Sequence, residues 1–158
     1  MASVLISYFS KSGNTKAMAQ SIKKGLDALG DLDVRLKKVQ DTTIDDLRSS
    51  DGIIMGSPTY FGVMAAEVKQ LMDKSIQCYG KLVGKVGGAF TSSGAIGGGN
   101  ETTIMSILQG LLIHGMIVQG VQKGNHYGPV SIGAPNEAVL GECVQYGKMM
   151  GELVKRLD

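Results

Sequence analysis

Three segments of the sequence combine hydroxyl side chains with glycine, a composition suited to holding a small ligand by hydrogen bonds. The first, Ser10-Lys11-Ser12-Gly13-Asn14-Thr15, offers three hydroxyls, one amide and a glycine that permits a tight turn. Hydroxyl donors together with the N–H groups of a helix start can bind a phosphate without an arginine. The segment therefore predicts a phosphate-binding loop, although a polar turn capped by Thr15 would use the same residues.

The second segment is Gly56-Ser57-Pro58-Thr59-Tyr60-Phe61-Gly62. It places two aromatic residues side by side in a chain with only three Phe and five Tyr. Because flat rings stack on flat rings, this pair indicates a slot for a planar ligand. The alternative is that Phe61 is an ordinary core residue.

The third segment runs from Thr91 to Glu101 and is rich in serine and glycine. Small residues let backbone amides approach a ligand closely. Such N–H donors beside a redox-active ring would stabilise the negative charge that appears on reduction. A flexible loop before a helix would have a similar composition.

Several other kinds of site have no counterpart in the sequence. A Walker A loop and the Gly-x-Gly-x-x-Gly pattern of dinucleotide sites are both missing from the first segment. The sequence also shows no Ser-His-Asp pattern, no histidine-rich metal cluster and no paired carboxylates. We therefore expect a monophosphate ligand, and we assign no catalytic side chain or metal ligand.

The elements that must position these segments follow from hydrophobic periodicity. Apolar runs predict five strands, over residues 3–9, 34–36, 52–56, 86–90 and 116–120. Helical spacing predicts helices over residues 15–29, 65–75, 101–114 and 138–157, with Asn100 as an N-cap. This alternation predicts a single α/β domain over residues 1–158, a parallel sheet covered on both faces. Ligands of such sheets bind beyond the carboxyl ends of the strands, where the three segments lie.

The bulk composition excludes some partners. The net charge is +2 and the lysines are scattered, so we expect no binding to nucleic acid or anionic membranes. The apolar runs are too short to span a bilayer. Cys78 and Cys143 are far apart and not in metal-ligand spacing, which suits a reducing compartment. With no secretory leader in view, a cytoplasmic setting is expected.

The motifs also carry a family resemblance over nearly the whole chain. The run from Tyr8 to Thr15 resembles the flavodoxin signature for the FMN phosphate. The second and third segments, and His114-Gly115-Met116-Ile117, are similar to the WrbA family of flavodoxin-like NAD(P)H:quinone oxidoreductases. The resemblance implies a three-layer flavodoxin-like sandwich whose five strands take the order 2-1-3-4-5. It also implies FMN as cofactor, NAD(P)H as electron donor and a quinone or similar acceptor.

Residue by residue, the resemblance implies one cofactor site. The phosphate would be held by Ser10, Ser12, Gly13, Asn14 and Thr15. The flavin would be lined by Pro58, Thr59, Tyr60 and Phe61, its ring edge wrapped by Ser92, Ser93, Gly94, Ala95, Ile96 and Gly97, with His114 nearby. His114 could instead be a helix-terminal histidine that interacts with the helix dipole. The family usually has Arg where Tyr60 stands, and a Trp that this chain lacks.

Two other functions compete with the oxidoreductase. A one-electron carrier would dock on redox proteins, which usually requires a surface of one charge sign, and a net charge of +2 counts against it. A receiver module of the same topology would need carboxylates at the strand ends, where Ser10, Ser57 and Thr91 stand instead. The oxidoreductase and the one-electron carrier are both compatible with a homo-oligomer.

Overall fold

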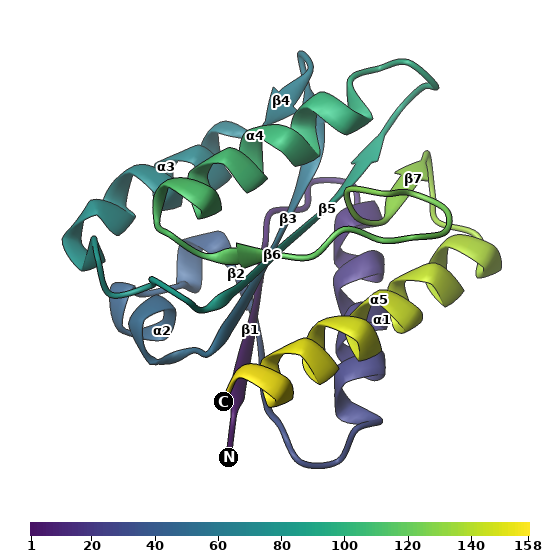
Figure 1. The fold of residues 1–158 in the computed structure, drawn as a ribbon. Coiled ribbons are helices and arrows are strands. Elements are labelled where there is room, and N and C mark those ends of the chain that lie inside the picture. Colours follow the sequence, from purple (N-terminus) through teal and green to yellow (C-terminus); the bar gives the residue numbers. More distant parts are fainter.

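A parallel sheet forms the centre of the protein, and a computed structural model describes it over all residues 1–158. The strands follow the path β2-β1-β3-β5-β6, with β4 paired to β3 and β7 paired to β5 (Figure 1). Their bounds are β1 Ser3–Tyr8, β2 Asp33–Lys38, β3 Gly52–Tyr60, β4 Val63–Met64, β5 Val86–Ser93, β6 Ile117–Val118 and β7 Val130–Ile132.

The predicted five-stranded sheet in the order 2-1-3-4-5 is wrong in its number of strands, because the sheet has seven. The five predicted strands correspond to the path above, and the two additional ones are short. β4 forms because the chain turns back on β3 and pairs with it antiparallel. β7 forms because the strand beside β5 is interrupted: β6 pairs with its start and β7 with its end. The α/β class is confirmed.

Helices cover both faces of the sheet, as Figure 1 shows for α1 and α5 on one side and α3 and α4 on the other. The helices are α1 Asn14–Asp27, α2 Ile44–Ser49, α3 Ala66–Lys74, α4 Asn100–Ile113 and α5 Glu137–Leu157, with short 3-10 turns η1 Val39–Asp41 and η2 Ser75–Cys78. None of them combines the length and apolar character that a membrane span requires.

Alternation along the strands divides the apolar residues between two cores. In β1, Leu5 packs with α3 and α4, whereas Val4 and Ile6 pack with α1 and α5. In the core on the α1 and α5 side, these two helices pack closely against each other. Gly25 of α1 lies directly against the backbone of Val144 of α5, at a position where any side chain would collide. Both faces of the central strands are therefore buried, and the strand ends are left to carry ligands.

Two local features differ from the sequence prediction. Asn100 is the first residue of α4 rather than its N-cap, a position held by Gly99 in a left-handed conformation with φ 103°. The helix α2 was not predicted, since its six residues are too few to show a helical period. It is fixed by a capping box, in which Thr43 and Asp46 each bond to the other's backbone N–H.

Candidate functional site

The carboxyl ends of three neighbouring strands bring the three segments to one edge of the sheet. β1, β3 and β5 are adjacent and parallel. They are followed respectively by residues 9–13, by the turn to β4, and by residues 94–99. Two of these loops almost touch, because a Cβ placed on Gly99 would lie 2.5 Å from Gly62 Cα.

The loop after β1 leaves several hydrogen-bond donors without acceptors. Gly13 precedes α1 in a left-handed conformation, φ 98°, and no side chain at that residue caps the helix. The N–H of Gly13 instead donates to Ser10 Oγ at 3.1 Å. The N–H groups of Ser12, Asn14 and Thr15 have no acceptor within the protein. Three unpaired donors thus lie within four residues at the start of a helix, the positive end of its dipole.

The chemistry of this donor set fits a phosphate. No acidic residue lies in the first turn of α1, and Lys11 and Lys16 flank the loop. The space in front of the turn is open, since a Cβ on Gly13 would meet no atom within 4 Å. Donors that face open space at a helix start are suited to the terminal phosphate of a mononucleotide.

Buried hydroxyls hold the loops to one another. Thr15 Oγ1 and Ser92 Oγ lie 2.9 Å apart, which connects the start of α1 to the end of β5. Thr59 Oγ1 lies 3.0 Å from Thr91 Oγ1, and the Thr91 hydroxyl donates to the carbonyl of Ser57 at 2.7 Å. The ends of β3 and β5 are therefore joined by side chains as well as by the sheet.

The turn between β3 and β4 displays its aromatic side chains. Phe61 and Gly62 form a two-residue hairpin turn with φ of 50° and 82°. Phe61 is fully exposed, so the alternative that it is a core residue is wrong. Tyr60 is 37% exposed and rests edge-on against Phe9, with ring centroids 6.5 Å apart. Pro58 is half-buried at the base of the turn.

The loop after β5 offers backbone donors to the same space. Ser93 is buried, and its hydroxyl donates to the carbonyl of Ala95 at 3.0 Å, which tightens the turn. The N–H groups of Gly94, Ala95, Ile96 and Gly97 have no acceptor within the protein. The side chain of Ile96 is 89% exposed. The loop thus presents unpaired N–H groups beside an apolar side chain.

His114 is not brought to these loops. It caps the far end of α4, about 20 Å along the helix from Asn100. Because the Ser75 hydroxyl donates to the carbonyl of Met72, the 2.6 Å bond from Ser75 Oγ to His114 Nε2 must use the histidine as donor. Burial lowers the pKa of His114. The structure therefore does not bring His114 to the three loops of its own chain; it lies at the end of α4, with its ring 5.9 Å from that of Tyr79.

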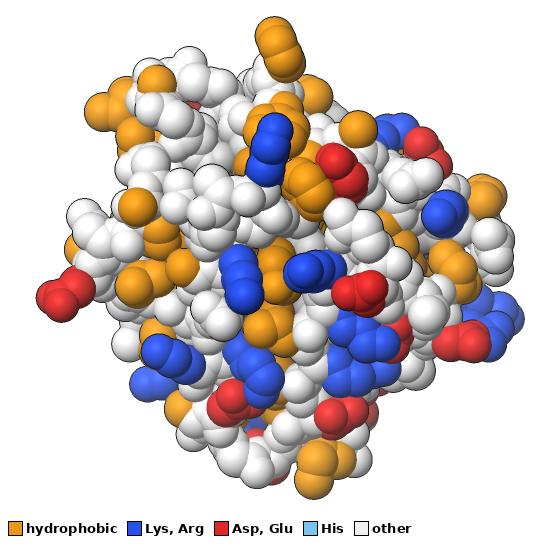
Figure 2. Space-filling view, turned by 180° about the vertical axis from the view of Figure 1, so that it is seen from behind, with side chains coloured by type: hydrophobic (Ala, Val, Ile, Leu, Met, Phe, Trp, Pro, Cys, Tyr) orange, Lys and Arg blue, Asp and Glu red, His pale blue; other side chains and the backbone are white.

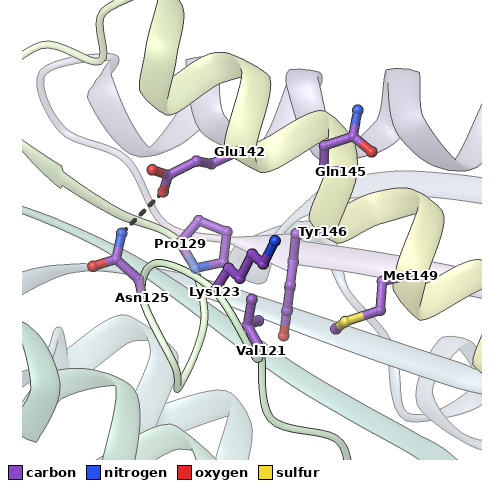
Figure 3. A pocket seen from close by; sticks show the side chains of 8 residues that line it. All are labelled: Val121, Lys123, Asn125, Pro129, Glu142, Gln145, Tyr146 and Met149. Carbon is purple, nitrogen blue, oxygen red and sulfur yellow. Dashed lines mark hydrogen bonds between the residues drawn. The ribbon is translucent and has the colours of Figure 1, made fainter.

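Two features of the structure were not predicted from the sequence, one within the candidate site and one outside it. Thr91 was not assigned to the site, although a hydroxyl at a strand exit was its signal. The second is a cavity of about 380 Å³ between α5 and the loop that interrupts the last strand (Figure 3). Its walls include Tyr146 and Met149, and Asn125 Nδ2 donates to Glu142 Oε2 at 3.0 Å. No residue of the three loops lines it, so the cavity is separate from the candidate site.

Comparison with known proteins places the chain among flavoproteins. Residues 41–126 match the family described as NADPH-dependent FMN reductase. A flavodoxin of Aquifex aeolicus is 38% identical over 98% of this chain and 88% of its own length. An NAD(P)H dehydrogenase (quinone) of Archaeoglobus fulgidus is 32% identical over 99% of this chain and all of its own length. The crystal structure of a WrbA-like flavodoxin from Agrobacterium tumefaciens has the same fold, with a TM-score of 0.86 at 23% identity over the full length of both chains.

Proposed function

Because the chain belongs to the NADPH-dependent FMN reductase family of flavodoxin-like proteins, we propose that it is an FMN-dependent oxidoreductase. Electrons pass from NAD(P)H to a quinone or a similar small acceptor. A curated relative that matches the chain along its whole length carries the name NAD(P)H dehydrogenase (quinone).

One observation of the structure carries the proposal: the N–H groups of Ser12, Asn14 and Thr15 are unpaired at the start of α1. A helix start with open donors and no acidic neighbour favours a monophosphate. We assign the phosphate to these residues together with Ser10 and Gly13. The loop after β5 also leads into a helix, but α4 carries Glu101 in its first turn, which disfavours a second phosphate there.

The remaining loops are assigned to the ring. Pro58, Thr59, Tyr60 and Phe61 line one side, and Ser92 through Gly97 wrap the edge. FMN supplies the hydride chemistry when bound, so the protein contributes position and electrostatics rather than an acid or a base. The unpaired N–H groups after Ser93 are placed to stabilise negative charge. The side chains of Phe61 and Ile96 are both exposed, and we assign them to the approach of a planar acceptor.

The cofactor can be identified directly. Acid releases a non-covalent flavin from the purified protein, and its mass distinguishes FMN from FAD. We expect FMN. Recovery of FAD, or failure to bind any flavin after reconstitution, would contradict the proposal.

The reaction is tested by stopped-flow reduction of the FMN-loaded protein with NADH and with NADPH, followed by a benzoquinone chase. We expect at least one nicotinamide to reduce the flavin on the timescale of turnover, and benzoquinone to reoxidise it. If neither nicotinamide does so while a strong one-electron donor does, the protein is a carrier.

The carrier is the second candidate, favoured by the flavodoxin relative at 38% identity. The distribution of charge on the surface does not favour a carrier. Lys and Arg side chains alternate with Asp and Glu on the face drawn in Figure 2, and the net charge is only +2. A carrier steered to its partners usually has a surface of one dominant sign.

We further propose that the chain is one FMN-binding domain that works in the cytoplasm and associates with copies of itself. Both cysteines are free and buried, which suits a reducing compartment. Two consecutive apolar residues near the end of α4, Leu112 and Ile113, are 52% and 73% exposed, and exposed apolar side chains of this kind favour self-association. Light scattering after size exclusion measures the oligomeric state, and a monomer at all concentrations would contradict self-association.

A further inference from the structure

A buried hydrogen bond connects the two halves of the proposed flavin site. Thr15 Oγ1 and Ser92 Oγ are 2.9 Å apart, and the two residues are 1% and 5% exposed. Thr15 belongs to the helix that follows β1, whereas Ser92 belongs to β5, and β3 lies between these strands in the sheet. The bond therefore spans the sheet, from the phosphate loop to the loop assigned to the ring.

The backbone and the side chain of Thr15 serve different partners. Its N–H has no acceptor within the protein and belongs to the phosphate donors. Its hydroxyl is buried and already engaged by Ser92. A phosphate in the open cradle can thus be held by the N–H while the hydroxyl stays bonded to β5.

Ser92 in turn is held on a short, well-defined stretch of sheet. It pairs with Pro58 of β3 on one side and with Ser131 of β7 on the other. The N–H groups that we assign to the ring begin two residues later, at Gly94. The side chain of Ser92 therefore stands at the point where the sheet ends and that loop begins.

We propose that Thr15 is a positioning residue for the flavin ring, acting through Ser92, and is not only a phosphate ligand. The proposal rests on the proposed function, since it requires that the site bind a flavin. The proposal distinguishes an effect on binding of the phosphate from an effect on binding of the flavin ring. A residue that contacts only phosphate affects FMN alone, whereas one that acts through Ser92 also affects a flavin that has no phosphate.

The test compares FMN with riboflavin, which has the ring and lacks the phosphate. Dissociation constants of both are measured by fluorescence titration for Thr15→Val, Thr15→Ser, Ser92→Ala and the double variant Thr15→Val/Ser92→Ala. Valine removes the hydroxyl and keeps the branched shape, and serine keeps the hydroxyl. Thr15→Ala breaks the same bond with a smaller side chain, should Thr15→Val not fold.

We expect Thr15→Val to weaken riboflavin binding about three- to tenfold, the loss of one hydrogen bond. Ser92→Ala should weaken it too, and the double variant should be no weaker than the weaker single variant, because both break the same bond. Thr15→Ser should bind both flavins as the unmodified protein does. Thr42→Ala is the control, since Thr42 forms a buried hydroxyl pair with Ser7 at 2.8 Å outside the three loops. It should lower the free energy of unfolding without changing riboflavin affinity.

Other outcomes overturn the proposal. If Thr15→Val weakens FMN but leaves riboflavin unchanged, Thr15 is a phosphate ligand only. If the effects of the two single variants multiply in the double variant, the two hydroxyls act independently. If the unmodified protein binds neither flavin, the proposed function itself fails, which is a different result from either of these.

Discussion

Polar groups are satisfied in opposite ways at the β2–α2 edge of the sheet and at the three loops beyond β1, β3 and β5. At the β2–α2 edge, Asp46 accepts hydrogen bonds from Lys37 at 2.8 Å and from Arg35 at 3.3 Å. It also accepts from the backbone N–H of Thr43, so one carboxylate closes a strand, a helix cap and two cations into one cluster. At the loops, by contrast, several N–H groups have no acceptor within the protein, and the buried links are made by neutral hydroxyls, which bond to one another and to backbone groups.

This difference distinguishes polar groups that hold the fold together from polar groups that are available to bind a ligand. In the cluster at the β2–α2 edge the Asp46 carboxylate is paired with Lys37 and Arg35 inside the fold, although Arg35 Nε has no hydrogen-bond partner. A loop with unpaired donors is incomplete until an acceptor arrives. Substitutions at the first edge should therefore change stability without changing flavin affinity, and substitutions at the loops should change affinity, with or without stability.

The largest expected effect is at Gly99, where the loop after β5 meets the β3–β4 turn. Gly99→Ala places a Cβ 2.5 Å from Gly62 Cα at a φ of 103°, so it combines a backbone clash with an unfavourable conformation. We expect a loss of about 3 kcal/mol in the free energy of unfolding, and weaker FMN binding because the loops move apart.

Gly97→Ala is the matched control for this variant. Gly97 has a φ of 71° but no atom within 4 Å of the added Cβ. Its cost in denaturant unfolding should be about 1 kcal/mol, the conformational part alone. Equal losses for the two variants would show that the two loops are not in close contact.

Asp46→Asn should have the next largest effect, at the β2–α2 edge. Burial alone would raise the pKa of Asp46, but the hydrogen bonds from Lys37 and Thr43 lower it to about 2. The ionised form is therefore stabilised in the fold by about 2 kcal/mol, which Asp46→Asn should remove at neutral pH. FMN affinity should not change.

The same pKa gives this cluster a defined acid sensitivity. Because the folded pKa lies below the unfolded one, the stabilisation is present above about pH 4 and is lost as the pH falls toward 2. Chemical unfolding of the unmodified protein and of Asp46→Asn between pH 5 and pH 2 measures this loss of stability. Curves that remain parallel across this range would contradict the assignment to Asp46.

The sequence predicts the central features of this fold because they depend on long periodic runs. The four long helices begin and end within two residues of their predicted bounds. What could not be predicted is short or depends on distant contacts. The six-residue α2 shows no period, and β7 exists only because β5 offers a free edge to Val130–Ile132.

The site shows the same limit. Composition and spacing located the three loops, because glycine and hydroxyl residues leave a local signal at strand ends. They could not show that the hydroxyl of Thr15 turns to Ser92, 77 positions away. Nor could they place His114, since being near a loop in a family pattern does not reveal that a whole helix separates the two.

His114 provides the third prediction, again with an effect on stability alone. Its pKa is lowered by burial, so the unfolded state binds a proton more readily than the folded one. The free energy of unfolding should therefore decrease as the pH falls through about 6.5, by up to about 1.4 kcal/mol per pH unit. His114→Asn should lack this component, and the FMN dissociation constant should be unaffected. A pH slope that survives in the variant would assign it to another group.

The smallest effect, and the only one of opposite sign, is expected at the tip of the β3–β4 turn. A two-residue turn with positive φ at both positions favours Asn-Gly, and here Phe61 occupies the first position at φ 50° while fully exposed. Phe61→Asn removes this strain and loses no buried surface, so it should raise the free energy of unfolding by about 0.5–1 kcal/mol. The same variant should weaken FMN binding, because we assign the exposed ring of Phe61 to the flavin site, where backbone strain of this kind is often found. Phe61→Tyr keeps the ring and should leave both quantities unchanged. Thermal unfolding of the apoprotein and fluorescence titration with FMN measure the two effects separately; a Phe61→Asn variant that is more stable and binds FMN equally well would remove Phe61 from the site.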